Sequence, residues 1–149
     1  MSAETWGSVA AEQNVMISLD IDEMSLAGVR DEVRALLAEH SGLVAEDAVQ
    51  VSDELVSNAF RHGQSPRTMR VSRTVDGRRL RIEVDDTAEA GPVKRTPDHT
   101  GGLGLLLVER LALAWGTRLR RTHKTVWAEL DLSGPAGYLA AVACPRPPG

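Results

Sequence analysis

Hydrophobic residues in the middle of the chain recur at the spacing of a helix that is buried on one face. Between residues 45 and 63, AEDAVQVSDELVSNAFRHG, they return every three or four positions, which is the period of an amphipathic helix. We therefore predict a helix from about Ala45 to Arg61, ended by Gly63. The apolar positions of its buried face are Ala48, Val49, Leu55, Val56, Ala59 and Phe60.

A second amphipathic helix and a short strand precede this one. Ser25 is a preferred N-cap residue, and the hydrophobic positions after it again follow a helical period up to Leu37. We therefore predict a helix that ends before Ser41-Gly42. Residues 14–19 form a short apolar run, which predicts a strand.

Alternating residues after the central helix predict a β-hairpin. Hydrophobic positions alternate with polar ones over residues 69–75 and 80–84, and Asp76-Gly77 between them favours a tight turn. The polar positions of this hairpin, which we expect to face solvent, are Arg70, Arg79, Arg81 and Glu83.

The chain then loses its hydrophobic period over a long stretch. Residues 86–101 contain two prolines and several charges, and loops of this length in a compact domain are often lids or binding loops. The glycine-rich GGLG of residues 101–104 follows. It leads into a predicted apolar helix over residues 105–115, stopped by Gly116.

Two further alternating strands, over residues 117–122 and 125–132, complete a pattern in which helices are grouped between hairpins. That order predicts an α+β two-layer sandwich, with a mostly antiparallel, mixed sheet covered on one face by helices. We expect one domain over residues 14–132, a flexible leader over residues 1–13, and a disordered Pro/Gly/Ala-rich tail over residues 133–149.

Composition is that of an ordinary soluble protein. The chain has 149 residues, of which 42% are apolar and 26% charged, and this fits one domain with a real core. No apolar run approaches the roughly 20 residues of a membrane span, and the start lacks the basic and apolar segments of a signal peptide. The single cysteine, Cys144, excludes an internal disulfide framework and a multi-cysteine zinc site. We therefore expect a cytoplasmic location.

Three polar residues at four-residue spacing border the buried face of the central helix. Glu54, Asn58 and His62 lie one turn above one another on such a helix. On the floor of a pocket they would supply a base, a metal ligand and a hydrogen-bond donor. Taken alone, a core helix with polar flanks is the more frequent explanation of such a pattern.

Two further features suit nucleotide binding without requiring it. Glycines ahead of a helix let a phosphate approach the N–H groups at the positive end of its dipole, but GGLG alone also suits a simple tight turn. Asp86 shares the strand face of Ile82 and Val84, so its carboxylate should point under the helices, where it needs a partner. A purine amine or a loop N–H could be that partner.

Arginines crowd the predicted hairpin. Such a run can attract nucleic-acid phosphates, yet the net charge of −4 favours solvated arginines or a docking face for an acidic protein. We therefore expect no direct nucleic-acid partner. The arginines concerned are Arg67, Arg70, Arg73, Arg78, Arg79 and Arg81.

Taken together and in order, these features resemble a known family. The segments SDELVSNAFRHG, LRIEVDD, GGLGLLLVERLALAWGT and KTVWAEL are similar to motifs of the GHKL, or Bergerat-fold, ATP-binding domain. They are most similar to those of stand-alone bacterial anti-sigma-factor serine/threonine kinases, over about residues 15–132. The resemblance implies binding of ATP and Mg²⁺, sequestration of a sigma factor, and phosphorylation of a serine on an anti-sigma-factor antagonist. Partner-switching members are often dimers.

The resemblance also implies roles for individual residues. Glu54 matches the general base of the family, and Asn58 matches its Mg²⁺ ligand. Asp86 matches the acid that hydrogen-bonds the adenine amine. The remaining nucleotide contacts that it implies are His62, Gly102, Leu103, Gly104 and Thr125, and on charge alone we add Lys94 and Arg95 in the lid.

One departure from the family pattern leaves a second function open. Where the family has Asp-x-Gly-x-Gly, residues 86–90 read DTAEA, and alanine lacks the conformational freedom of glycine. The altered glycines favour a module that sequesters a sigma factor or another regulatory protein, with weak, structural or no nucleotide. The intact Glu54 favours a kinase.

Overall fold

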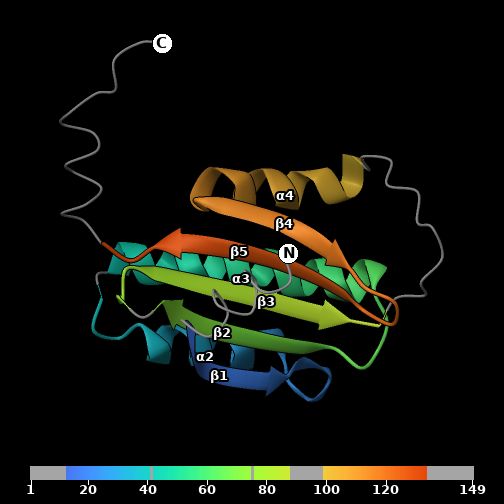
Figure 1. Ribbon diagram of the computed structural model, residues 1–149, viewed down its shortest axis with the longest axis horizontal. Coiled ribbons are helices and arrows are strands. Elements are labelled where there is room, and N and C mark those ends of the chain that lie inside the picture. The colour runs from blue at the N-terminus through green and yellow to red at the C-terminus, as the bar shows by residue number, and fades with distance from the viewer. Residues whose placement is uncertain (1–12, 41, 75, 88–98, 134–149) are drawn as a thin grey trace, which may run out of the picture.

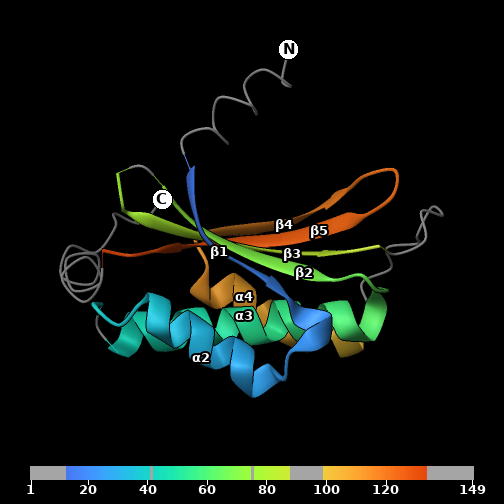
Figure 2. The same ribbon diagram turned by 90° about the horizontal axis from the view of Figure 1, so that it is seen from below.

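A single layer of helices covers one face of a five-stranded antiparallel sheet (Figures 1 and 2). The structure is a computed structural model that describes residues 13–40, 42–74, 76–87 and 99–133. The predicted leader and nearly all of the predicted tail lie outside these residues. In chain order the elements are β1 (Gln13–Asp20), the short 3-10 helix η1 (Ile21–Glu23), α2 (Leu26–Leu36), α3 (Gly42–His62), β2 (Thr68–Thr74), β3 (Arg79–Asp86), α4 (His99–Leu111), β4 (Ala114–Leu119) and β5 (Lys124–Asp131).

The central helix packs against the inner face of the central strands. The strands lie in the order β1-β2-β3-β5-β4, and α3 runs between α2 and α4 beneath the sheet (Figure 2). The predicted α+β two-layer sandwich is therefore confirmed, although all four strand pairings are antiparallel and the sheet is not mixed.

The starts of α2 and α3 have different causes, a capping side chain for α2 and burial of the first turn for α3. The side chain of Ser25 accepts a hydrogen bond from the backbone N–H of Gly28 at 3.0 Å, which confirms Ser25 as the N-cap of α2. α3 begins at Gly42, earlier than the predicted start near residue 45. The reason is that Val44 and Ala45 are both buried, so the hydrophobic face of this helix extends one turn further back.

Hydrophobic side chains from α3 and from the inner face of the sheet form the core. Leu55 of α3 and Leu80 and Ile82 of β3 are fully buried, as the hydrophobic pattern predicts. Phe60 is the exception, because its side chain is 44% exposed. It lies beyond the edge of the buried face, on the side of α3 that faces α2, and the Arg67 guanidinium stacks over its ring at 4.4 Å from the centroid.

The glycine-rich segment belongs to α4 rather than to a loop ahead of it. α4 begins at His99, so that residues 101–104 lie within its first two turns, whereas the sequence pattern predicts a start at residue 105. Most of the predicted long loop, residues 88–98, lies outside the described residues. The predicted role of GGLG as a loop that precedes the helix is therefore corrected.

The end of α4 also differs from the prediction. α4 ends at Leu111, and Trp115, predicted to be helical, pairs with Ala128 in β5. Gly116 does not stop a helix but lies in β4 beneath Trp127, where a Cβ would come within 3.2 Å of the indole ring. Pairing with β5 and packing of Trp115 against the hydrophobic core outweigh the local helical period.

The outer face of the sheet carries an ion-pair network in place of solvated arginines. The hairpin that carries these arginines has the predicted turn, because Gly77 has a φ of 73°.

Arg81, expected to face solvent, is only 6% exposed. It forms ion pairs with Glu83 at 3.1 Å and with Glu129 at 3.0 Å, and its guanidinium stacks over the Trp127 ring. The prediction of exposure is wrong for this residue, since parity gives the face but not the packing on it.

Candidate functional site

The end of α3 and the end of β3 meet at one end of the molecule. Asp86, the last residue of β3, is 1% exposed and points under the helices, as its alternation with Ile82 and Val84 predicts. Its side chain packs directly on Gly63, the residue after α3, where an added Cβ would overlap the Cβ, Cγ and Oδ2 of Asp86. The absence of a side chain at Gly63 is what allows the carboxylate to be buried here.

Hydrogen bonds from Thr87 to backbone carbonyls fix this junction. The N–H of Thr87 donates to the carbonyl of Gln64 at 2.9 Å, and the Thr87 hydroxyl donates to the carbonyl of Ser65 at 2.5 Å. The strand that carries Asp86 is therefore tied to the segment that follows α3. In Figure 1 the same end of the molecule also holds the first turn of α4.

Glu54 and Asn58 lie on the flank of α3 that faces α4. Asp53 marks the opposite flank, because its carboxylate is 3.0 Å from Arg30 of α2. Successive residues of a helix are about 100° apart, which puts Glu54 on the other side of the buried face, with Asn58 one turn further on. Both residues are partly exposed, so they are accessible to a ligand.

The spacing along α3 suits an extended nucleotide. Gly63 lies nine positions after Glu54, which corresponds to about 13 Å of helix axis. A nucleoside triphosphate whose base lies at Asp86 can therefore extend its phosphates along α3 toward Asn58 and Glu54. The donor set also fits, because a carboxylate accepts from a base amine and an amide oxygen suits Mg²⁺.

Arg67 clamps the C-terminal end of α3 to the start of the helical layer. Its guanidinium donates to the carbonyls of Ala59 and Gly63, both at 3.1 Å, and to Asp22 Oδ1 at 2.8 Å. Burial acts to raise the pKa of Asp22, but hydrogen bonds from Arg67 outweigh it and hold that pKa below its ordinary value. The carboxylate's contribution to stability is therefore present at neutral pH and is lost as the pH falls through this lowered pKa.

We expect Arg67→Lys to destabilise the fold by about 3 kcal/mol, because lysine keeps the charge but cannot bridge two carbonyls and a carboxylate in one plane. Urea unfolding monitored by circular dichroism measures the change. The matched control is Arg34→Lys, since Arg34 pairs with Glu46 at 2.9 Å on an exposed surface and should cost no more than about 0.5 kcal/mol. Equal losses in the two variants would show that Arg67 does not stabilise the end of α3 through its bonds to Ala59, Gly63 and Asp22.

Thr125 and Lys124 lie on opposite faces of the sheet. In the register of β3 and β5, Asp86 pairs with Lys124 and Asp85 pairs with Thr125. The Thr125 hydroxyl donates to Asp85 Oδ1 at 2.6 Å, on the face away from the helices, so the structure does not bring Thr125 together with Asp86. The inward residue is Lys124, whose Nζ lies 3.6 Å from Asp86 Oδ2.

Sequence reasoning did not identify Lys124, Gly63 or Arg67 as site residues. Gly63 is visible in the sequence only as a helix stop, and Arg67 only as one arginine of the hairpin cluster. The alternation in β5 indicates that Lys124 and Thr125 face opposite ways, but which of them faces Asp86 depends on the β3–β5 register.

For most of the other residues implied by the resemblance, the structure gives the element in which each lies. His62 is the exposed last residue of α3. Gly102, Leu103 and Gly104 lie in the first two turns of α4. Lys94 and Arg95 lie outside the described residues, as do residues 88–90 of the altered glycine motif.

Within the described residues, no group of three or more His, Cys, Asp or Glu side chains could hold a metal ion. A Mg²⁺ ion bound by one amide oxygen and otherwise by phosphate oxygens and water needs no such group. Asn58 is therefore the described side chain that suits this role.

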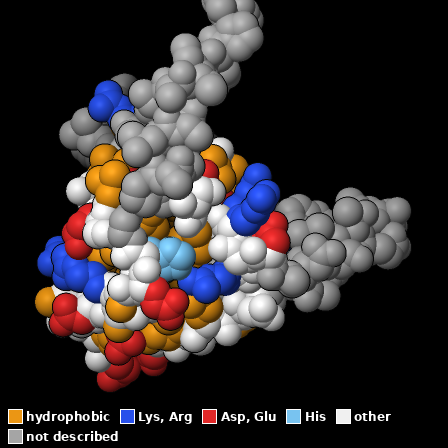
Figure 3. Space-filling view, turned by 90° about the vertical axis from the view of Figure 1, so that its left-hand side faces the viewer, with side chains coloured by type: hydrophobic (Ala, Val, Ile, Leu, Met, Phe, Trp, Pro, Cys, Tyr) orange, Lys and Arg blue, Asp and Glu red, His pale blue; other side chains and the backbone are white. Residues whose placement is uncertain are grey.

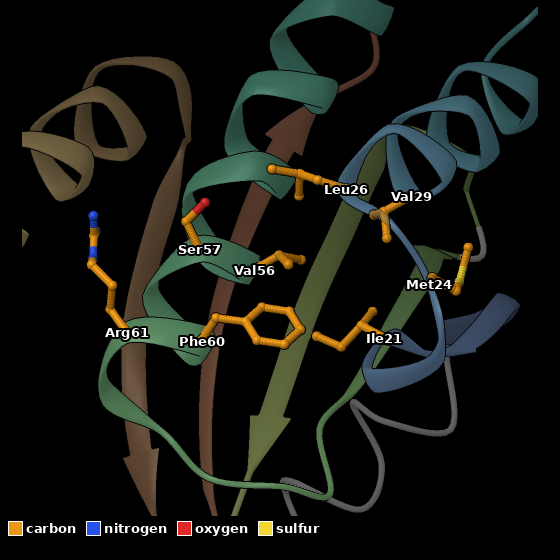
Figure 4. Close-up of a pocket in the computed structure, with 8 residues that line it drawn as sticks. All are labelled: Ile21, Met24, Leu26, Val29, Val56, Ser57, Phe60 and Arg61. Atoms are coloured by element: carbon orange, nitrogen blue, oxygen red, sulfur yellow. The ribbon is translucent and has the colours of Figure 1, made fainter.

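A groove of about 360 Å³ lies elsewhere on the helical layer, between η1, α2 and α3. Figure 4 shows Phe60, Val56 and Ile21 lining it, while Arg61 points away from it. Its side chains are mostly apolar, so it lacks the groups that a triphosphate needs. It lies on the α2 side of α3, away from the flank of Glu54 and Asn58.

The arginines of the hairpin are mostly engaged in intramolecular contacts. Arg70 pairs with Asp85 at 2.6 Å, Arg79 with Glu129 at 3.6 Å, and Arg73 contacts His40 at 2.9 Å. Figure 3 views the end of the molecule opposite the junction of α3 and β3, and there acidic, basic and hydrophobic side chains are intermixed. Acidic partners therefore balance the charge of Arg70 and Arg79 within the fold, whereas the contact of Arg73 with His40 does not neutralise its guanidinium.

Comparison with known proteins identifies the family. The profile described as histidine kinase-like ATPase domain matches residues 19–129. Among solved structures, the Acinetobacter baumannii histidine kinase AdeS is similar with a TM-score of 0.45 and 14% sequence identity, over 89% of this chain and 76% of that chain. No curated protein sequence matches the chain.

The two-layer fold of the described residues, with three helices on one face of a five-stranded antiparallel sheet, is that of a GHKL-type ATPase domain. The chain belongs to the histidine kinase-like ATPase domain family, whose profile covers most of its length. Domains of this type bind ATP, generally together with Mg²⁺. In the part of the chain that the structure describes, no helix is long and apolar enough to cross a membrane.

Proposed function

We propose that this protein is an ATP- and Mg²⁺-binding anti-sigma factor that phosphorylates a serine or threonine of an anti-sigma-factor antagonist. The observation that carries the proposal is the placement of buried Asp86 against Gly63, with Glu54 and Asn58 along the same helix. This arrangement offers a base-binding carboxylate and a phosphate-binding flank. The choice of the anti-sigma branch rests on the sequence resemblance.

In the proposed reaction, Asp86 of β3 binds the base, and Asn58 and Glu54 of α3 act at the phosphates. Asp86 accepts a hydrogen bond from the adenine amine and so fixes the base, and Asn58 would hold Mg²⁺, which neutralises charge on the phosphate oxygens when it is bound. Glu54 takes the proton of the attacking hydroxyl. The hydroxyl oxygen forms a bond to the γ-phosphorus, the bond from that phosphorus to the β,γ-bridging oxygen breaks, and ADP leaves with the bond's electron pair.

A second candidate function is a non-catalytic module that sequesters a sigma factor or another regulatory protein. The sequence DTAEA at residues 86–90 supports it, because the family's glycines are missing there. Such a module would hold nucleotide weakly, hold it structurally, or not bind it.

Calorimetric titration of ATP–Mg²⁺ tests the nucleotide site. We expect saturable binding to the wild-type chain and at least about tenfold weaker binding to Asp86→Asn, because the amide loses the charge-assisted hydrogen bond to the base amine. The matched control is Asp85→Asn. Asp85 is the neighbouring acid on the opposite face, paired with Arg70 at 2.6 Å, and its replacement should leave ATP affinity unchanged.

Two outcomes would count against the proposed site. Absence of binding at millimolar ATP would reject the kinase function for this chain. Equal loss of affinity in the Asp86 and Asp85 variants would show that the effect comes from the end of β3 as a whole and not from a carboxylate that reads the base.

A further inference from the structure

Lys124 of β5 forms an ion pair with Asp86, the residue proposed to bind adenine. It is the first residue of β5 and lies directly opposite Asp86 in the register of the two strands. Its side chain is 13% exposed, that of Asp86 is 1% exposed, and Nζ lies 3.6 Å from Oδ2. The pair therefore sits on the inner face of the sheet, next to Gly63 and the end of α3.

The geometry of this pair leaves the ammonium able to bind another acceptor. A separation of 3.6 Å is that of an ion pair and is too long for a hydrogen bond. An ammonium group carries three N–H donors, and a largely desolvated charge is costly unless further hydrogen bonds satisfy it. A ligand that brings an acceptor beside Asp86 would supply such a bond.

Adenine presents that combination on one edge. Its exocyclic amine is a donor, and the neighbouring ring nitrogen N1 is an acceptor. We propose that Lys124 is a second base-recognition residue, which donates to N1 of adenine while Asp86 accepts from the exocyclic amine. This inference rests on the proposed function, because it assigns the base to the junction of α3 and β3.

The strand register fixes the order in which the acceptor Asp86 and the donor Lys124 face a bound base. The acceptor is fixed on β3 against Gly63, and the donor lies on β5, one strand further along the sheet. Hypoxanthine presents the reverse order, with a carbonyl in place of the amine and an N–H in place of the acceptor N1. The pair therefore favours adenine over six-oxo purines.

Removing either partner of the proposed hydrogen bond tests it. ATP and 1-deaza-ATP, in which a C–H replaces N1, are titrated by calorimetry into the wild-type chain and into Lys124→Met. We expect the wild type to bind ATP about tenfold more tightly than 1-deaza-ATP, as for a hydrogen bond to a charged group. Lys124→Met should bind both nucleotides equally, near the wild-type affinity for 1-deaza-ATP. Arg121→Met, in the exposed turn before β5, is the control and should keep the wild-type preference.

The other outcomes overturn the inference in distinguishable ways. If Lys124→Met weakens both nucleotides and keeps the preference for ATP, Lys124 only holds Asp86 in place. If Lys124→Met binds ATP more tightly, the ion pair blocks the base site. If the wild type binds ATP but does not distinguish 1-deaza-ATP, N1 is not read. If the wild type binds no ATP at all, the proposed function fails together with the inference. Thermal unfolding of each variant shows whether an affinity change reflects misfolding.

Discussion

Replacing Gly63 by alanine should abolish nucleotide binding and destabilise the fold at the same time. The new Cβ would overlap the Cβ and Cγ of Asp86, atoms close to the backbone of β3 that cannot move without shifting the strand. We expect a loss of about 2–3 kcal/mol in the free energy of unfolding, as for an overpacked core position. Displacing Asp86, and with it Lys124, should weaken ATP binding by about 100-fold. Urea unfolding and ATP–Mg²⁺ calorimetry measure the two effects.

The chain offers a matched control for this substitution. Gly42, at the first position of α3, has no neighbouring atom within 4 Å of an added Cβ, so Gly42→Ala should keep both stability and affinity. A double variant, Gly63→Ala with Asp86→Gly, removes the overlapping side chain. It should recover part of the lost stability without recovering ATP binding, because contacting residues are energetically coupled. If Gly63→Ala binds ATP like the wild type, Asp86 does not have to be buried against the end of α3.

Much of the fold could be predicted from local periodicity. The alternation over β3 identifies both the strand and the inward direction of Asp86, and the stripe over α3 identifies the long central helix. Prediction fails where tertiary packing competes with a local pattern. Trp115 continues a helical stripe in sequence, yet it pairs with β5, and Arg81 has the parity of a solvated residue, yet Trp127 and two glutamates bury it.

The candidate site is only partly visible in the sequence for the same reason. Spacing of four residues is enough to place Glu54 and Asn58 on one flank of a helix, because that relation is local. The contact of Gly63 with Asp86 and the pairing of Lys124 with Asp86 join segments that are far apart in the chain. Neither contact follows from a pattern within one element, since each depends on which strand neighbours β3 and in which register.

Glu54→Gln should remove phosphoryl transfer while leaving nucleotide binding nearly intact. Glutamine has almost the shape of glutamate but cannot take the proton of the attacking hydroxyl, and a general base typically contributes about 10²–10⁴-fold to a rate. We therefore expect transfer of the labelled γ-phosphate, to candidate antagonist proteins and to water, to fall by about 1,000-fold. The affinity for ATP–Mg²⁺, measured by calorimetry, should change by less than about twofold, because Glu54 lies about 13 Å of helix axis away from the residue beside Asp86.

Asp53→Asn is the control for this substitution, because Asp53 is the neighbouring acid of α3 on the flank that faces α2, 3.0 Å from Arg30. It should keep the wild-type rate of transfer, with at most a small loss of stability. Equal rates for wild type and Glu54→Gln would show that Glu54 is not the base. If the wild type binds ATP but transfers phosphate to neither acceptor, the second function applies. The nucleotide would then stabilise the layer of α3 and α4 as a surface that holds a partner, and Glu54 would have no proton to move.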